Sequence, residues 1–286
     1  MLVPARAQEP SAQAAPVLLV PRFAPGERVR YRMTLTVATQ SKLEPLRSSA
    51  PEIEPARVVF DFGWQLEAVE AAPDGSVSLR ATLETLQIAS SPPSTAPPAT
   101  EPYLGKPVAY RVTSDGRVED IQAPPEWLEE GKPPAWLRAW LEKSSQSTGV
   151  LPRRPIAPGE SWQDERDIEV PGLPRQRLRS VSTYLRDEEV NGVPCAAVTT
   201  RFELGGSETR EERNPDGTTV TLDTRAEGSG SRLSCYDLAN GRLLESTQTT
   251  EETYRAGVRR GAERSAAPVM LLETRTKIES HLRVVP

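Results

Sequence analysis

The sequence predicts a mainly β protein, in which long antiparallel strands form a curved sheet or half-barrel. We expect two tandem meanders with a short tryptophan-rich helical insert between them. Three observations support this fold class. Long stretches alternate apolar and polar residues with the period of two that a half-buried strand requires. A five-residue motif, and the order of strands after it, occurs twice. One segment between the two copies has a helical period instead.

The first meander begins with a strand at residues 29–37, in which every second residue is apolar. A second strand, at 58–68, has the most aromatic face in the protein, because Phe60, Phe62 and Trp64 alternate with polar residues. A third follows at 77–88, and its apolar phase changes near Glu84, which predicts a β-bulge or a bend. Residues 90–102 are rich in proline and predict a solvated loop before a fourth strand.

The helical insert covers residues 124–149 and holds three of the five tryptophans. Trp136, Leu137, Trp140 and Leu141 fall on one stripe of a helix that starts after a Pro-Pro pair. We expect this stripe to pack into the concave side of the sheet.

The repeat defines the domain organisation. Phe-Ala-Pro-Gly-Glu at 23–27 returns as Ile-Ala-Pro-Gly-Glu at 156–160, and Asp-Gly-Arg-Val at 115–118 returns as Asn-Gly-Arg-Leu at 240–243. The similar spacing predicts two copies of one meander within one integrated domain. The predicted divisions are a signal remnant and linker (1–20), the first meander (21–123), the insert (124–149) and the second meander (150–286).

The second meander predicts a long final strand at 270–284, whose apolar residues share one face. A strand of this length reaches ~50 Å, which is typical of curved or barrel-like sheets. The hairpin at residues 208–225 has an entirely polar first arm, so we expect it to project or to lie at an edge.

Charge and hydropathy exclude several partners. The chain has a net charge of -5 and no run of Lys or Arg, which argues against nucleic acid. No stretch approaches the ~20 apolar residues that span a bilayer, so no transmembrane segment is expected. Ala5-Arg6-Ala7 has the small-x-small form of a signal-peptidase site, but the apolar region that should precede it is missing. We expect that the true start lies upstream and that the protein is exported to the periplasm or the medium; the alternative is that the resemblance is chance.

Cys195 and Cys235 are the two cysteines, and both fall in predicted strands. Because CxxC spacing is absent, an oxidising compartment favours a disulfide between them over a metal or redox site. The alternative is that they are two unrelated buried thiols.

The inventory of reactive residues is poor. The single histidine, His281, lies on the polar face of the last strand, which argues against Ser-His, Cys-His and multi-His metal schemes. No phosphate loop or nucleophile motif occurs. We therefore expect no enzyme, no cofactor and no metal. Two carboxylates brought together by folding remain a distant alternative.

The apolar strand faces are the better candidates for function. Curved amphipathic strands around a helix either fill their concavity with side chains or leave room for an apolar ligand such as a lipid. The candidate ligand-binding residues are Phe60, Phe62, Trp64, Trp136 and Trp140. The competing hypothesis is an envelope protein that contacts another protein through the 208–225 hairpin or an exposed sheet edge.

The segment from Leu151 to Trp162 carries the pattern LPxxPIxPGExW. It resembles a signature found in families of uncharacterised exported bacterial β proteins. The overall plan is also similar to periplasmic lipoprotein carriers of the LolA and LolB kind, which implies an apolar ligand but transfers no site residues. No cysteine near the N-terminus could accept a lipid, so anchoring by acylation is not expected.

Overall fold

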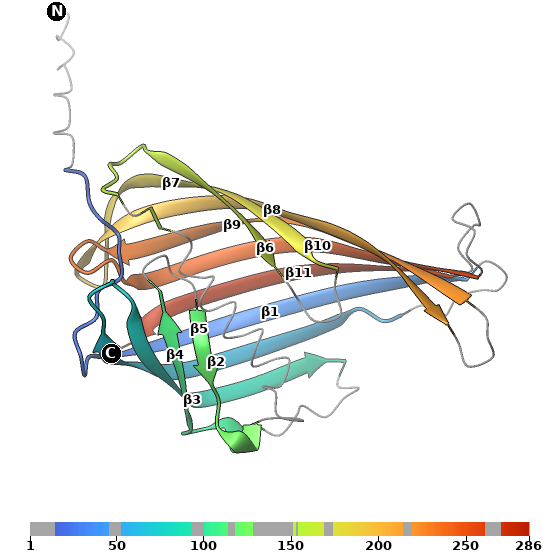
Figure 1. Ribbon diagram of the computed structural model, residues 1–286, viewed down its shortest axis with the longest axis horizontal. Helices are drawn as coiled ribbons and strands as arrows, with labels where there is room; N and C mark the ends of the chain where they lie inside the picture. Colours follow the sequence, from blue (N-terminus) through green and yellow to red (C-terminus); the bar gives the residue numbers. More distant parts are fainter. Residues whose placement is uncertain are drawn as a thin grey trace, which may run out of the picture.

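Figure 1 presents the computed structural model of the chain. The structure describes residues 15–45, 53–92, 100–113, 118–127, 151–152, 154–168, 174–213, 219–260 and 270–285. These residues form strands and two short 3-10 turns. The strands are β1 (Arg28–Pro45), β2 (Ala56–Ala71), β3 (Val77–Ser91), β4 (Pro107–Val112), β5 (Val118–Gln122), β6 (Ser161–Ile168), β7 (Gln176–Val190), β8 (Val193–Arg213), β9 (Thr219–Asp237), β10 (Leu243–Arg260) and β11 (Met270–Val285). The turns are η1 (Glu101–Tyr103) and η2 (Pro125–Trp127).

The strands form one sheet in the order β5-β4-β3-β2-β1-β11-β10-β9-β8-β7-β6, and every pair is antiparallel. Every pair joins strands that follow one another in the chain, except the β1–β11 pair, which joins the two meanders; β5 and β6 follow one another in the chain but do not pair. The sheet is open, with β5 and β6 as its edges, and both edges bend toward the same side (Figure 1). The predicted mainly β fold with long antiparallel strands is therefore confirmed.

The predicted bulge in β3 is present. The pairing of β2 with β3 shifts between Gly63 and Trp64, which lie opposite Thr85 and Leu83, and this shift leaves Glu84 without a partner in the register. The extra residue moves the apolar phase of β3 by one position, so that the large apolar side chains before and after the bulge still point to one face.

The two copies of the Ala-Pro-Gly-Glu motif make the same turn. The N–H of Gly26 donates to the carbonyl of Ala68 at 2.8 Å, and the N–H of Gly159 donates to that of Tyr184 at 2.6 Å. Both glycines have a positive φ, of 81° and 90°, which favours glycine over residues with a Cβ. Each turn thereby ties the entry to a meander to a neighbouring strand.

The main core lies at one end of the sheet, which we call the closed end. Here the inner face of the sheet, the face toward which the edges bend, is covered by the segment that precedes β1. Leu19 in that segment is fully buried, and Val17 forms an isolated antiparallel bridge with Ile156, which is also fully buried. The Leu-Pro-x-x-Pro-Ile signature thus contributes a core residue that pairs with the N-terminal segment.

An ion pair holds the closed end together. The Arg242 guanidinium contacts the Glu27 carboxylate and lies 3.9 Å from the Asp237 carboxylate. Because Arg242 follows β9 and Glu27 precedes β1, the pair links segments that are far apart in the sequence. Gly241 has a φ of +68°, and a Cβ there would lie 2.5 Å from the carbonyl oxygen of Val20. The N-terminal segment therefore passes directly over this glycine.

The helical insert is described only at its start. Trp127, in η2, is 2% exposed, and its indole N–H donates to the carbonyl of Pro102 at 3.0 Å. Its ring packs edge-on against Tyr103 with centroids 5.5 Å apart. The predicted helix, with Trp136 and Trp140, lies outside the described residues, as does the predicted signal-peptidase site. Within the described part of the chain, no helix has the length and apolarity that a membrane crossing needs.

Candidate ligand-binding face

The inner face of the first meander carries a row of half-buried apolar side chains beyond the closed end. Register places Leu35 opposite Phe60, and Val37 opposite Val58. These side chains are only partly covered, in contrast to the packed core beside them. We call the following set the apolar strip: Met33, Leu35 and Val37 of β1, Val58 and Phe60 of β2, and Ile88 of β3.

Of the three aromatic residues of β2 that were predicted to bind a ligand, two lie in the core and one lies in the apolar strip. Phe62 and Trp64 are each 4% exposed and belong to the core, and Trp64 stacks on Tyr31 with ring centroids 5.5 Å apart. Phe60 is half-buried and stacks on Phe62 with centroids 5.8 Å apart. Phe60 thus extends the aromatic core into the apolar strip.

Tyr31 is buried in the core, next to the apolar strip. Desolvation raises the pKa of its phenol to about 12, although the cation of Arg242 acts in the opposite direction. A phenol in this position stays neutral at physiological pH.

The inner face of the second meander carries two pairs of buried hydroxyl groups beside apolar core residues such as Tyr184 and Val198. Ser182 and Thr200 face each other across β7 and β8 with their oxygens 2.9 Å apart. Ser234 and Ser246 do the same across β9 and β10 at 3.1 Å. All four side chains are buried, so the paired hydroxyls satisfy one another where water is excluded. We call them the hydroxyl ladder.

One cross-strand row connects the two kinds of surface. Leu35 of β1 faces Ser280 of β11, and Ser280 faces Gln248 of β10. The row continues through Arg232 of β9 to Thr200 of β8. Apolar and polar groups therefore meet near β11 on one continuous face. Sequence reasoning missed the hydroxyl ladder because serine and threonine at inward positions look unremarkable until register pairs them.

The outer face, opposite the inner face, has a different chemistry. A hollow of about 850 Å³ crosses β6 to β10, with Ser229, Ser231 and Thr249 among its lining residues. Two of its charged side chains pair with each other: Arg179 donates to Glu165 at 2.9 Å and holds the pKa of that carboxyl below its usual range. The hollow is open, and most of its lining side chains are charged or carry hydroxyl groups, so it suits water or a polar ligand better than an apolar one.

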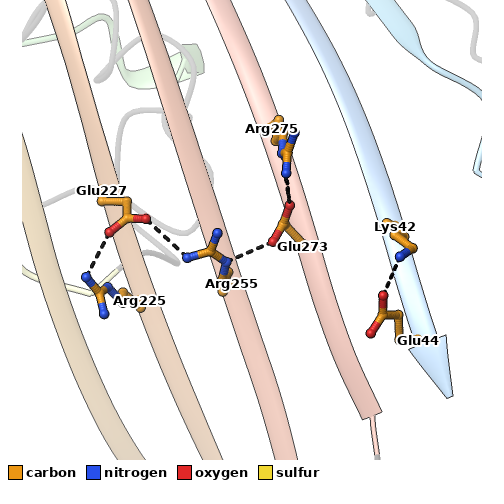
Figure 2. A network of polar contacts seen from close by, with 7 residues as sticks. All are labelled: Lys42, Glu44, Arg225, Glu227, Arg255, Glu273 and Arg275. Atoms are coloured by element: carbon orange, nitrogen blue, oxygen red, sulfur yellow. Dashed lines mark hydrogen bonds and ion pairs between the residues drawn. The ribbon is translucent and has the colours of Figure 1, made fainter. Parts of the chain in front are cut away.

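Figure 2 shows a charged network on this outer face, away from the closed end. Arg255 donates to Glu273 at 2.8 Å and to Glu227 at 3.1 Å. At the two ends of the network, Arg275 donates to Glu273 at 2.9 Å and Arg225 donates to Glu227 at 2.9 Å. Each carboxylate lies between two guanidinium groups, so the network joins β9, β10 and β11. Every charged group in it has a partner of opposite charge.

The groups most often used in catalysis are dispersed. His281 Nε2 lies 2.8 Å from the Glu245 carboxylate on the exposed outer face. In the part of the chain that the structure describes, no three His, Cys, Asp or Glu side chains gather so as to hold a metal ion.

Comparisons with known proteins add little to this picture. No protein-family model matches the chain, and no curated protein matches it. Among solved structures, it is similar to the β domain of the Bordetella autotransporter BrkA, at 10% identity and a TM-score of 0.20, over 90% of this chain and 98% of that one. It is also similar to OccK11 (OpdR) of Pseudomonas aeruginosa, at 8% identity and a TM-score of 0.20, over 95% and 100%. A TM-score this low carries no argument about function.

Proposed function

We propose that this protein is a non-catalytic exported protein that binds an apolar ligand such as a lipid along the apolar strip. The observation that carries the proposal is the continuity between core and strip. Trp64 and Phe62 are fully packed, whereas Phe60 and Leu35, next along the same face, remain half-buried. Apolar side chains that continue past a packed core provide area that a ligand can remove from water.

The polar half of the same face favours an amphipathic ligand. An acyl chain on Leu35 and Phe60 would place its polar end toward Ser280 and Gln248, because these residues share a cross-strand row. Hydroxyl and amide groups can both donate and accept hydrogen bonds, so they suit an ester, hydroxyl or phosphate group.

Two neighbouring valines provide the test. Val58 points to the inner face and Val59 to the outer face of the same strand, and both are half-buried. We expect Val58→Asn to weaken lipid binding several-fold, because the ligand would bury the rest of a side chain whose full burial contributes about 1.5–3 kcal/mol, and because the new amide would lose hydrogen bonds to water. Val59→Asn is the matched control and should bind like the natural protein.

The measurement is titration with a fatty acid and with phospholipid vesicles, followed by tryptophan emission. Binding should quench the emission or shift it to the blue, because Trp64 lies next to the strip. Unchanged emission at saturating lipid, or equal weakening by the two valine substitutions, would overturn the proposal.

A second candidate function is contact with another envelope protein through the β8–β9 hairpin. Residues 208–213 of β8 are all exposed, and among the described strands they pair with β9 alone. Such a strand edge can receive an extended partner segment, although its charges oppose non-specific pairing. Shortening the hairpin should abolish capture of the partner, and unchanged capture would contradict this candidate.

A further inference from the structure

Two thiols lie together on the outer face at the closed end. Cys195 of β8 is fully buried, and Cys235 of β9 is 6% exposed. Register places Cys195 opposite Asp237, and Cys235 opposite Ala197, so the two cysteines are diagonal neighbours that point to the same side of the sheet. Both thiols are free in this structure.

A carboxylate and apolar side chains surround the two thiols. Cys235 Sγ lies 4.0 Å from a Glu188 carboxylate oxygen, and Cys195 shares the same buried cluster. Ala197 and Leu244 complete a small apolar cluster, against which further valines pack. The following valines take part: Val190, Val193 and Val284. The pair is thus held in a dry environment separate from the main core.

This environment suppresses thiolate formation in the folded protein. Burial raises the pKa of Cys195 to about 12, and the Cys235 thiol adds to the effect. Burial likewise raises the pKa of Cys235, with a further contribution from the charge of Glu188. Because the thiolate is the reactive species in disulfide exchange, the folded pair reacts slowly with an oxidant at neutral pH.

We infer that Cys195 and Cys235 are the site of an intramolecular disulfide that forms by exchange with a small disulfide oxidant while the chain folds. One cysteine thiolate attacks the oxidant and releases its first thiol. The second cysteine then attacks the mixed disulfide and releases the other thiol. The protein loses two thiol hydrogens and two electrons, and the oxidant is reduced to two thiols.

The geometry permits closure with a small adjustment. Diagonal neighbours in an antiparallel ladder lie about 7–8 Å apart, slightly beyond the ~7 Å that a disulfide spans without backbone movement. Since both side chains point to the same side of the sheet, side-chain rotation and a closer approach of β8 and β9 would bring the sulfurs to bonding distance. The closed bond would staple the β8–β9 hairpin beside the Arg242–Glu27 ion pair, whether or not the inner face binds a ligand.

The test follows reduced full-length protein in one oxidised and reduced glutathione buffer at mildly alkaline pH. One sample stays folded, and a second is unfolded in guanidinium and then diluted into the buffer. After quenching, both are denatured and alkylated, and mass spectrometry counts the modified cysteines. We expect none modified in the refolded sample, with the loss of two hydrogens, and both modified in the folded sample over the same hours.

Two modified cysteines, or two glutathione adducts, after refolding would overturn the disulfide. Equally fast oxidation of the folded sample would overturn its formation during folding. A stability measurement adds a separate criterion, because closing a loop of about 40 residues should raise Tm by about 10 °C in the oxidised protein. The double variant C195A/C235A should show no redox-dependent Tm, and a shift that persists there would contradict the assignment.

Discussion

Along the cross-strand row that contains Leu35, the first meander places apolar side chains where the second places hydroxyl, amide and guanidinium groups. On the apolar side, Phe62 and Trp64 gain stability by leaving water. On the polar side, Ser182 and Thr200 are equally buried but gain little, because their hydrogen bond replaces hydrogen bonds to water. The difference teaches that side chains of similar burial on one face of a sheet can contribute unequally to stability.

The largest expected effect comes from Trp64→Ala in the first meander. Trp64 is 4% exposed and stacks on Tyr31, so removing it leaves a large cavity in the core. We expect the free energy of unfolding to fall by about 3–5 kcal/mol, as measured by denaturant titration. Removing the Trp64 ring would also take away core contacts beside the apolar strip.

Thr200→Val in the second meander is the matched comparison. It keeps the side-chain shape but leaves the Ser182 hydroxyl without its partner, at a cost of about 1–2 kcal/mol. The double variant Ser182→Ala with Thr200→Val should recover part of this loss. If Thr200→Val costs as much as Trp64→Ala, the two halves contribute equally and the comparison fails.

An intermediate effect is expected from Gly230→Ala, which tests packing within the polar half. A Cβ at Gly230 would lie 2.3 Å from Cζ of Phe202 and 2.5 Å from the carbonyl oxygen of Thr249. Phe202 faces Gly230 across β8 and β9, so the missing side chain makes room for its ring. We expect a loss of about 2 kcal/mol in the free energy of unfolding.

Gly205→Ala is the control for that substitution. Its added Cβ would meet only the carbonyl oxygen of Ala226, at 3.9 Å, so the change should stay within about 0.5 kcal/mol. Equal losses of unfolding free energy at Gly205 and Gly230 would show that the cost comes from replacing a glycine in a strand, and not from the contact with the ring of Phe202.

The sequence predicted strands well because their signal is local. The residues with alternating apolar side chains form strands β1, β2 and β11 in the structure. The phase change at Glu84 located the bulge, because the apolar residues before and after it lie on different phases of the sequence. The motif at 23–27 and its copy at 156–160 correctly indicated two meanders in one sheet.

The site was harder to predict because it depends on register. Alternation gives Phe60 and Trp64 the same face but not the same burial, which depends on what packs over each of them. The pairing of Ser182 with Thr200 likewise follows from the β7–β8 register and has no local sequence signal. Strand patterns therefore predicted the faces, whereas the structure was needed to separate core, apolar strip and hydroxyl ladder.

The smallest effect is expected on the outer face, where the charged network of Figure 2 tests whether the contrast is confined to the inner face. Arg255 is 41% exposed, so we expect Arg255→Met to lower the free energy of unfolding only slightly, and by less still in 1 M salt. Arg255 and then Arg275 lower the pKa of Glu273, so this contribution is present at neutral pH and is lost as the pH falls through that pKa. Arg225→Met, which removes an outer contact of the network, is the control for charge alone. A loss at Arg255 comparable to that at Trp64 would mean that the outer-face ion pairs, and not the apolar half of the inner face, dominate the stability of the sheet.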